Sequence, residues 1–119
     1  MRRSVIAVAA ILFGSCTAYA AEIGGAYSVQ GTNLDGSPYR GTAEITVTSD
    51  TTCEISWTTG KTESQGFCML KDDAFAAGYV LGDEIGLVIY NVNDDGTLDG
   101  AWTITGKDGS GTEVLTPVQ

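Results

Sequence analysis

Residues 41–49 read GTAEITVTS, and this stretch decides the fold class. Ala43, Ile45 and Val47 alternate with polar side chains, which is the two-residue period of a strand with one buried and one solvated face. Residues 98–104 repeat the design around Trp102. After residue 20, no stretch keeps the 3.6-residue apolar period of an amphipathic helix. The sequence therefore predicts an all-β protein.

Turn signals such as Asp-Gly and Thr-Gly pairs recur along the chain at intervals of about ten residues. They separate eight expected strands, at residues 26–33, 39–49, 52–59, 62–70, 74–81, 84–92, 97–105 and 112–117. Short strands joined by short connections favour an antiparallel up-and-down meander. Closing it into a barrel, or a flattened barrel, removes the exposed edges. A β-sandwich is the alternative.

The interior of so narrow a barrel is expected to be filled by side chains. Four small residues would face inward and relieve crowding, namely Gly31, Gly41, Gly66 and Gly100. Trp57 and Trp102 would fill the remaining space and leave little cavity. A filled interior would favour a protein-binding module, whereas an open mouth lined by aromatic side chains would favour a small hydrophobic ligand.

Residues 53–68 predict both a hairpin register and a disulfide. If Gly60 and Lys61 form a two-residue loop, Trp57 faces Ser64 and Cys53 lies directly opposite Cys68. Directly opposed residues in an antiparallel pair have Cα atoms about 4.5–5.5 Å apart, which is within disulfide range. We therefore expect a structural Cys53–Cys68 bond.

The first twenty residues have the layout of a secretory signal peptide. Arg2 and Arg3 precede an apolar run at residues 5–13 that is too short to span a bilayer, and residues 18–20 read AYA, a small-x-small cleavage pattern. We expect the mature protein to begin at Ala21, to form one domain over residues 21–119 and to be periplasmic or secreted. A lipobox-like stretch ending at Cys16 makes an outer-membrane lipoprotein the alternative.

Charge restricts the partners of the mature chain. The full sequence has a net charge of −9, and removing the leader takes away Arg2 and Arg3 but no acid, which gives −11. So acidic a chain repels nucleic acid and anionic membranes. The sequence has no second apolar run, so no transmembrane segment is expected. A protein partner is favoured over a small molecule, and that partner is expected to be basic.

The residue types argue against catalysis and against a cofactor. The sequence contains no histidine, so a common general base and zinc ligand is missing. Asn91, Asn93, Asp95 and Asp99 resemble the start of a calcium loop, but Trp102 stands where the loop needs a bidentate glutamate. An Asp-Gly hairpin turn explains the same residues. We predict no catalytic, cofactor or metal residues, and we retain a two-carboxylate hydrolase as a lesser alternative.

The strand expected at residues 84–92 is nearly continuously apolar, so its outer face must be covered by the N-terminal segment or by a partner. Leu87, Ile89, Tyr39 and Tyr90 are the candidate binding surface. Aromatic side chains could instead stack on a sugar or flat ligand, or simply fill the core.

A spaced pattern of turn glycines and aromatics runs through most of residues 27–117. It comprises Tyr27-x-Val29-x-Gly31-Thr32-Asn33, Asp35-Gly36-Ser37, Tyr39-x-Gly41, Trp57, Gly86-Leu87-x-x-Tyr90, Asp95-Gly96-Thr97-Leu98-x-Gly100-x-Trp102-Thr103 and Gly111-Thr112-Glu113-x-Leu115. The pattern resembles a family of small exported proteins of Gram-negative bacteria that are often labelled fibronectin-binding. The Cys53–Cys68 pair and residues 62–70 depart from the usual pattern of that family. The meander more loosely resembles avidin- and lipocalin-like barrels and periplasmic lysozyme inhibitors.

The sequence thus predicts an exported, non-catalytic binding module that engages a host-matrix or envelope protein. The resemblance to the exported family implies the same kind of partner. The alternatives are a calycin-like barrel that holds a small ligand, or a periplasmic enzyme inhibitor.

Overall fold

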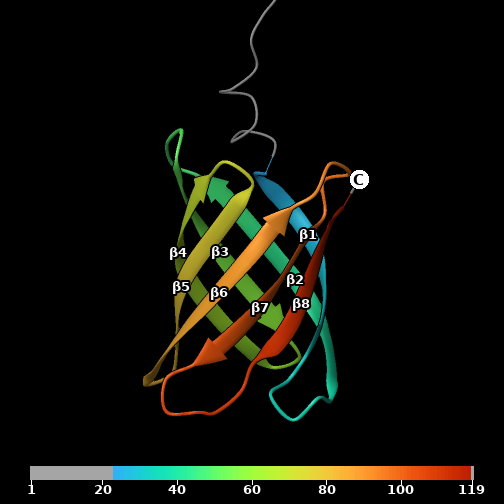
Figure 1. Ribbon diagram of the computed structural model, residues 1–119, viewed down its shortest axis with the longest axis vertical. Coiled ribbons are helices and arrows are strands. Elements are labelled where there is room, and N and C mark those ends of the chain that lie inside the picture. Colours follow the sequence, from blue (N-terminus) through green and yellow to red (C-terminus); the bar gives the residue numbers. More distant parts are fainter. Residues whose placement is uncertain (1–22, 119) are drawn as a thin grey trace, which may run out of the picture.

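The computed structural model describes residues 23–118, which form a closed antiparallel β-barrel (Figure 1). Each strand pairs with its sequence neighbours, and β1 pairs with β8 to close the barrel, so the sandwich alternative is excluded. The strands are β1 Gly25–Thr32, β2 Pro38–Val47, β3 Thr52–Thr59, β4 Thr62–Lys71, β5 Ala74–Leu81, β6 Glu84–Val92, β7 Leu98–Ile104 and β8 Gly111–Pro117. All eight predicted strands are present, and each end lies within two residues of its predicted position.

The hairpin register derived from the Gly60-Lys61 loop is confirmed. Trp57 faces Ser64 and Cys53 faces Cys68 across β3 and β4. Gly60 supports the tight turn because it adopts a φ of 63°, which side-chain-bearing residues rarely take. This register places Cys53, Ile55 and Trp57 on the buried face of β3.

One end of the barrel is packed solid. Phe75 and Tyr90 make an edge-to-face contact with ring centroids 5.4 Å apart, and both side chains are fully buried. Tyr27 donates a hydrogen bond of 2.6 Å to the backbone carbonyl of Ile23, and so holds the entry of the chain against this end. This apolar core stabilises the fold at one end of the barrel, so the opposite end does not need to be densely packed.

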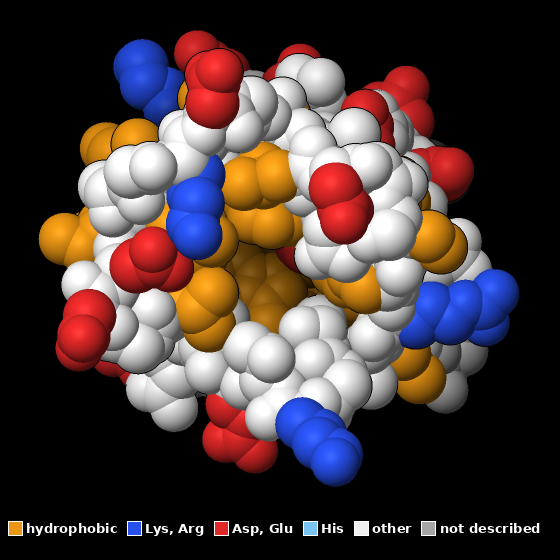
Figure 2. Space-filling view, turned by 90° about the horizontal axis from the view of Figure 1, so that it is seen from below, with side chains coloured by type: hydrophobic (Ala, Val, Ile, Leu, Met, Phe, Trp, Pro, Cys, Tyr) orange, Lys and Arg blue, Asp and Glu red, His pale blue; other side chains and the backbone are white. Residues whose placement is uncertain are grey.

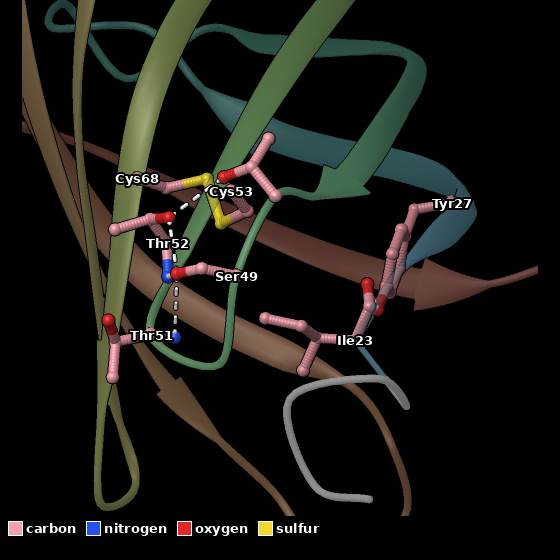
Figure 3. The surroundings of a disulfide bond; sticks show 8 residues. Ile23, Tyr27, Ser49, Thr51, Thr52, Cys53 and Cys68 are labelled. Carbon is pink, nitrogen blue, oxygen red and sulfur yellow. Dashed lines mark hydrogen bonds between the residues drawn. A yellow bond between two sulfur atoms is a disulfide. The ribbon is translucent and has the colours of Figure 1, made fainter. Parts of the chain in front are cut away.

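The predicted disulfide lies at the packed end. Cys53 and Cys68 are bonded, with Cα atoms 5.0 Å apart, and both are fully buried. Figure 3 shows the bond beside the turn that joins β2 to β3, where the backbone amide of Thr52 donates to the Ser49 hydroxyl. A disulfide is compatible with an oxidising compartment outside the cytoplasm.

The nearly continuous apolar sequence of β6 alternates in space. Gly86, Val88 and Tyr90 face inward, whereas Leu87 and Ile89 point outward with 60% and 63% of their surface exposed. Within residues 23–118 nothing covers this outer face. The part of the prediction that assigned the cover to the N-terminal segment concerns residues 1–22, which lie outside the described residues.

Candidate functional site

A cavity of about 390 Å³ opens at the end of the barrel opposite the packed core. Figure 2 looks into this end and shows a hollow lined by hydrophobic side chains, with charges of both signs around its rim. The cavity is lined by Asn33, Tyr39, Trp57, Thr59, Thr62, Ser64, Tyr79, Leu81, Val88, Trp102, Ile104 and Glu113. The expectation that Trp57 and Trp102 would fill the interior was therefore wrong.

Glycines keep the cavity open by letting aromatic rings lie flat against the wall. Tyr79 is directly opposite Gly86 in the β5–β6 pair, and a Cβ atom on that glycine would stand 2.1 Å from the Cζ atom of the ring. Tyr39 lies over Gly31 in the same way, with the corresponding distance at 2.5 Å. A side chain on either glycine would push the tyrosine ring opposite it into the lumen. Because glycine has no Cβ, each ring stays against the wall and the lumen remains open.

Trp102 follows the same rule. It pairs directly with Gly111, and a Cβ there would lie 2.5 Å from the Cε2 atom of the indole. Its ring makes an edge-to-face contact with Tyr39, with centroids 6.2 Å apart, while Trp57 and Tyr79 form a second such pair at 5.2 Å. The four rings therefore form two edge-to-face pairs that line the cavity and do not fill it.

Glu113 lies at the floor of the cavity and is 94% buried, since only 6% of its surface is exposed. Its Oε1 atom accepts a hydrogen bond of 2.5 Å from the Tyr39 hydroxyl. Its Oε2 atom accepts bonds of 2.5 Å from the Tyr90 hydroxyl and 2.8 Å from the Trp57 indole. Three donors replace the water that the carboxylate loses on burial, and bonds to a charged acceptor are among the stronger ones.

The same arrangement perturbs the tyrosines. Burial, and next the nearby charge of Glu113, raise the pKa of Tyr79 to about 12. The pKa values of Tyr39 and Tyr90 are also raised, first by burial and then by the charge of Glu113. All three phenols are therefore neutral donors at physiological pH.

Sequence reasoning missed Glu113 as a site residue, although a signal was present. In the strand expected at residues 112–117, Glu113 and Leu115 are two residues apart, so their side chains point to the same face of the sheet. If Leu115 is buried in the core, Glu113 must therefore face inward too. Its cross-strand partners are Gly31 and Gly100, which leave room for a long side chain. A carboxylate on an inward face between two glycines is the pattern that marks this position.

The four residues predicted as one binding surface separate into two groups. Leu87 and Ile89 lie on the outer wall, whereas Tyr39 lines the cavity and Tyr90 is fully buried beneath it, where it bonds to Glu113. Four of the aromatic ring-stacking candidates line the cavity, namely Tyr39, Trp57, Tyr79 and Trp102, whereas Tyr90 is buried beneath it and Tyr27 lies at the packed end.

The calcium-like stretch is a hydrogen-bonded turn. The Asp95 carboxylate accepts bonds from the backbone amide and the hydroxyl of Thr97, and Asn93 donates to Asp99. Residues 33–37 form the same turn at the other end of the barrel, with Asp35 accepting from Ser37. Within residues 23–118 no cluster of three or more His, Cys, Asp or Glu side chains could hold a metal ion.

The outer wall carries one apolar band. Phe67 faces Gly78, which in turn faces Leu87, and Met69 lines up with Ile89 through Ala76. The large side chains of this band are more than half exposed. No helix within the described part of the chain is long and apolar enough to cross a membrane.

Comparison with known proteins identifies the fold and no family. No family model and no curated protein matches the sequence. Among solved structures, a redesigned β-barrel has a TM-score of 0.72 and 18% identity, and covers 84% of this chain and 95% of its own. A second redesigned barrel, mFAP1, solved bound to DFHBI, has a TM-score of 0.70 and 21% identity, with 82% and 96% covered. A variant of the fluorescent protein UnaG has a TM-score of 0.54 and 9% identity, with 83% and 98% covered.

Proposed function

We propose that this protein is a non-catalytic barrel that holds a small, mainly apolar ligand in the cavity at its open end. The observation that carries the proposal is an open-mouthed cavity of about 390 Å³ whose lining includes four aromatic rings. Cavities of this size, mostly apolar and with a few placed polar groups, are typical of small-molecule sites. This reverses the order suggested by the sequence, which ranked a protein partner first.

Two further points support the proposal. The similarly folded barrel mFAP1 was solved bound to the small molecule DFHBI, so the architecture is suited to such ligands. Glu113 is also the one carboxylate among the described residues that line the cavity, so a two-carboxylate hydrolysis has no second acid there. Together with the expected signal peptide and the disulfide, the cavity supports a carrier or sensor of small molecules outside the cytoplasm.

Naphthylmethanol, a flat and neutral aromatic alcohol, tests the proposal. We expect saturable binding to the mature protein by calorimetry, together with a rise in the thermal midpoint as the ligand stabilises the folded state. Thr59→Phe places a ring in the cavity and is expected to abolish binding. Thr58→Phe, one residue earlier on β3 and exposed on the outer wall, is the matched control and should bind normally. Equal affinity of the two variants would place the ligand elsewhere.

The apolar band on the outer wall favours a second candidate function, a contact with a protein partner. Phe67, Met69, Leu87 and Ile89 expose 54–63% of their surfaces, and monomeric proteins rarely leave large contiguous apolar patches uncovered. The family resemblance and the acidic charge point to a basic matrix or envelope protein. A pull-down with Leu87→Asn/Ile89→Asn as the control tests this, since a partner retained equally by both forms would not use the band.

A further inference from the structure

We propose that the cavity is selective for an organic cation, a small amine whose apolar body lies among the four aromatic rings and whose ammonium group lies against Glu113. The inference rests on the proposed function, because it names the chemical class of the ligand for the same cavity. It follows from which charges and which hydrogen-bonding groups remain available to a ligand.

The first argument is charge. Among the described residues that line the cavity, Glu113 is the one with a charged side chain, and it is 6% exposed. Only neutral donors compensate its charge: the hydroxyls of Tyr39 and Tyr90 and the indole of Trp57. A cation that reaches Glu113 therefore meets a buried carboxylate with no cationic partner among the described residues that line the cavity, in surroundings that screen charge less than water does.

The second argument is the remaining hydrogen-bonding capacity of that carboxylate. A carboxylate oxygen accepts about two hydrogen bonds. Oε2 receives two, from Trp57 and Tyr90, whereas Oε1 receives one, from Tyr39. Glu113 thus keeps one acceptor position on a side chain that forms part of the cavity wall, and an N–H group of an ammonium would satisfy it.

The third argument is that the ring donors are already engaged. Tyr79 donates to the backbone carbonyl of Thr103, and Trp102 donates to that of Thr112. The aromatic side chains that line the cavity therefore offer a ligand aromatic surface and no free N–H or O–H group. The negative face of an aromatic ring attracts cations, and cages of aromatic side chains recognise substituted ammonium ligands.

The rim does not oppose this selectivity. It carries both signs, and Lys107 lies 3.9 Å from Glu84 and is paired with it. Exposed charges of mixed sign at the mouth are screened by salt and provide little net field. The selectivity comes from the buried carboxylate.

Three probes that share one naphthyl body decide the matter in the intact mature protein: naphthylmethylamine as the cation, naphthylmethanol as the neutral form and naphthoate as the anion. We expect the amine to bind about ten- to hundredfold more tightly than the alcohol, since bonds to ionised partners are roughly twice as strong as neutral ones. Naphthoate should bind more weakly than either. Equal affinity of amine and alcohol, or tighter binding of naphthoate, would overturn the inference and leave the proposed function standing. Binding of none of the three would overturn both.

A pair of variants assigns the effect to its residue. Glu113→Gln keeps the shape and removes the charge, so the advantage of the amine over the alcohol should fall to about threefold or less. Glu63→Gln removes the same charge from the exposed outer face of β4 and should retain the full advantage. If both variants keep the advantage, Glu113 does not provide the selectivity and the inference fails. The wild-type comparison of the three probes decides alone if Glu113→Gln does not fold.

Discussion

Replacing Gly86 by alanine tests the contact that keeps the cavity open. The new Cβ would lie 2.1 Å from Cζ, 2.3 Å from Cε2 and 2.5 Å from the hydroxyl oxygen of Tyr79, distances that atoms do not reach. Gly86 has no positive φ, so alanine fits the backbone itself. The ring of Tyr79 must therefore leave the wall and swing into the cavity.

The expected cost follows from what the ring gives up. It loses the 3.1 Å hydrogen bond to the carbonyl of Thr103, worth about 0.5–1.5 kcal/mol, and the edge contact with Trp57, worth a similar amount. Alanine returns about 0.4–1 kcal/mol by restricting the unfolded chain. The middle of these ranges leaves a net loss of about 1.3 kcal/mol, which should lower the thermal midpoint by about 5–10 °C in a domain of this size.

Gly78→Ala is the matched control on the same hairpin. Its Cβ would point outward and meet the Cδ2 atom of Leu87 at 3.8 Å and the carbonyl oxygen of Gly86 at 4.0 Å, which are ordinary contacts. This variant should melt at the same temperature as wild type or slightly higher, and should bind naphthylmethanol normally. Gly86→Ala should both melt lower and bind more weakly. If the two variants behave alike in thermal unfolding and in calorimetry, the ring does not depend on the glycine and the explanation of the open cavity is wrong.

Three further predictions concern stability. Changing both Cys53 and Cys68 to alanine should cost about 2–4 kcal/mol of unfolding free energy in denaturant titrations, because the bond closes a 15-residue separation. Ligand affinity should be unchanged, since the bond lies at the packed end, and two titratable thiols in the unreduced wild type would contradict the pairing. Tyr90→Phe should destabilise the barrel by about 1.5–3 kcal/mol and Tyr27→Phe by about 0.5–1.5 kcal/mol, because Tyr90 donates to a buried carboxylate whereas Tyr27 donates to a backbone carbonyl. Equal shifts of the thermal midpoint would count against the network. The pKa of Tyr79 rises from 10.0 to about 12 on folding, so the contribution of this phenol to the free energy of unfolding should be complete below pH 10 and be lost as the pH rises toward 12. A free energy of unfolding that does not change across that pH range would be inconsistent with a buried phenol.

The strands, their order and the hairpin register were predictable because they depend on local information. Alternation of side chains fixes which residues face inward, and the Gly60-Lys61 loop fixes which residues pair. Closure and the disulfide follow, since a meander of eight short strands removes its edges by closing and opposed cysteines in a hairpin lie within bonding distance. All of these features follow from the two-residue alternation of side chains and from the lengths of the turns, and both can be read directly from the amino-acid sequence.

The cavity could not be predicted in the same way, because it depends on how side chains from non-adjacent strands divide a shared volume. Alternation correctly placed Trp57 and Trp102 inside the barrel, but whether an inward ring fills the lumen or lies against the wall depends on the residue opposite it. The three donors of the Glu113 carboxylate lie on β2, β3 and β6, and they are 23 to 74 residues away from Glu113 along the chain. The sequence determined which side chains face inward; only the closed barrel decided which of them meet, because volume and hydrogen-bond geometry are properties of the assembled interior.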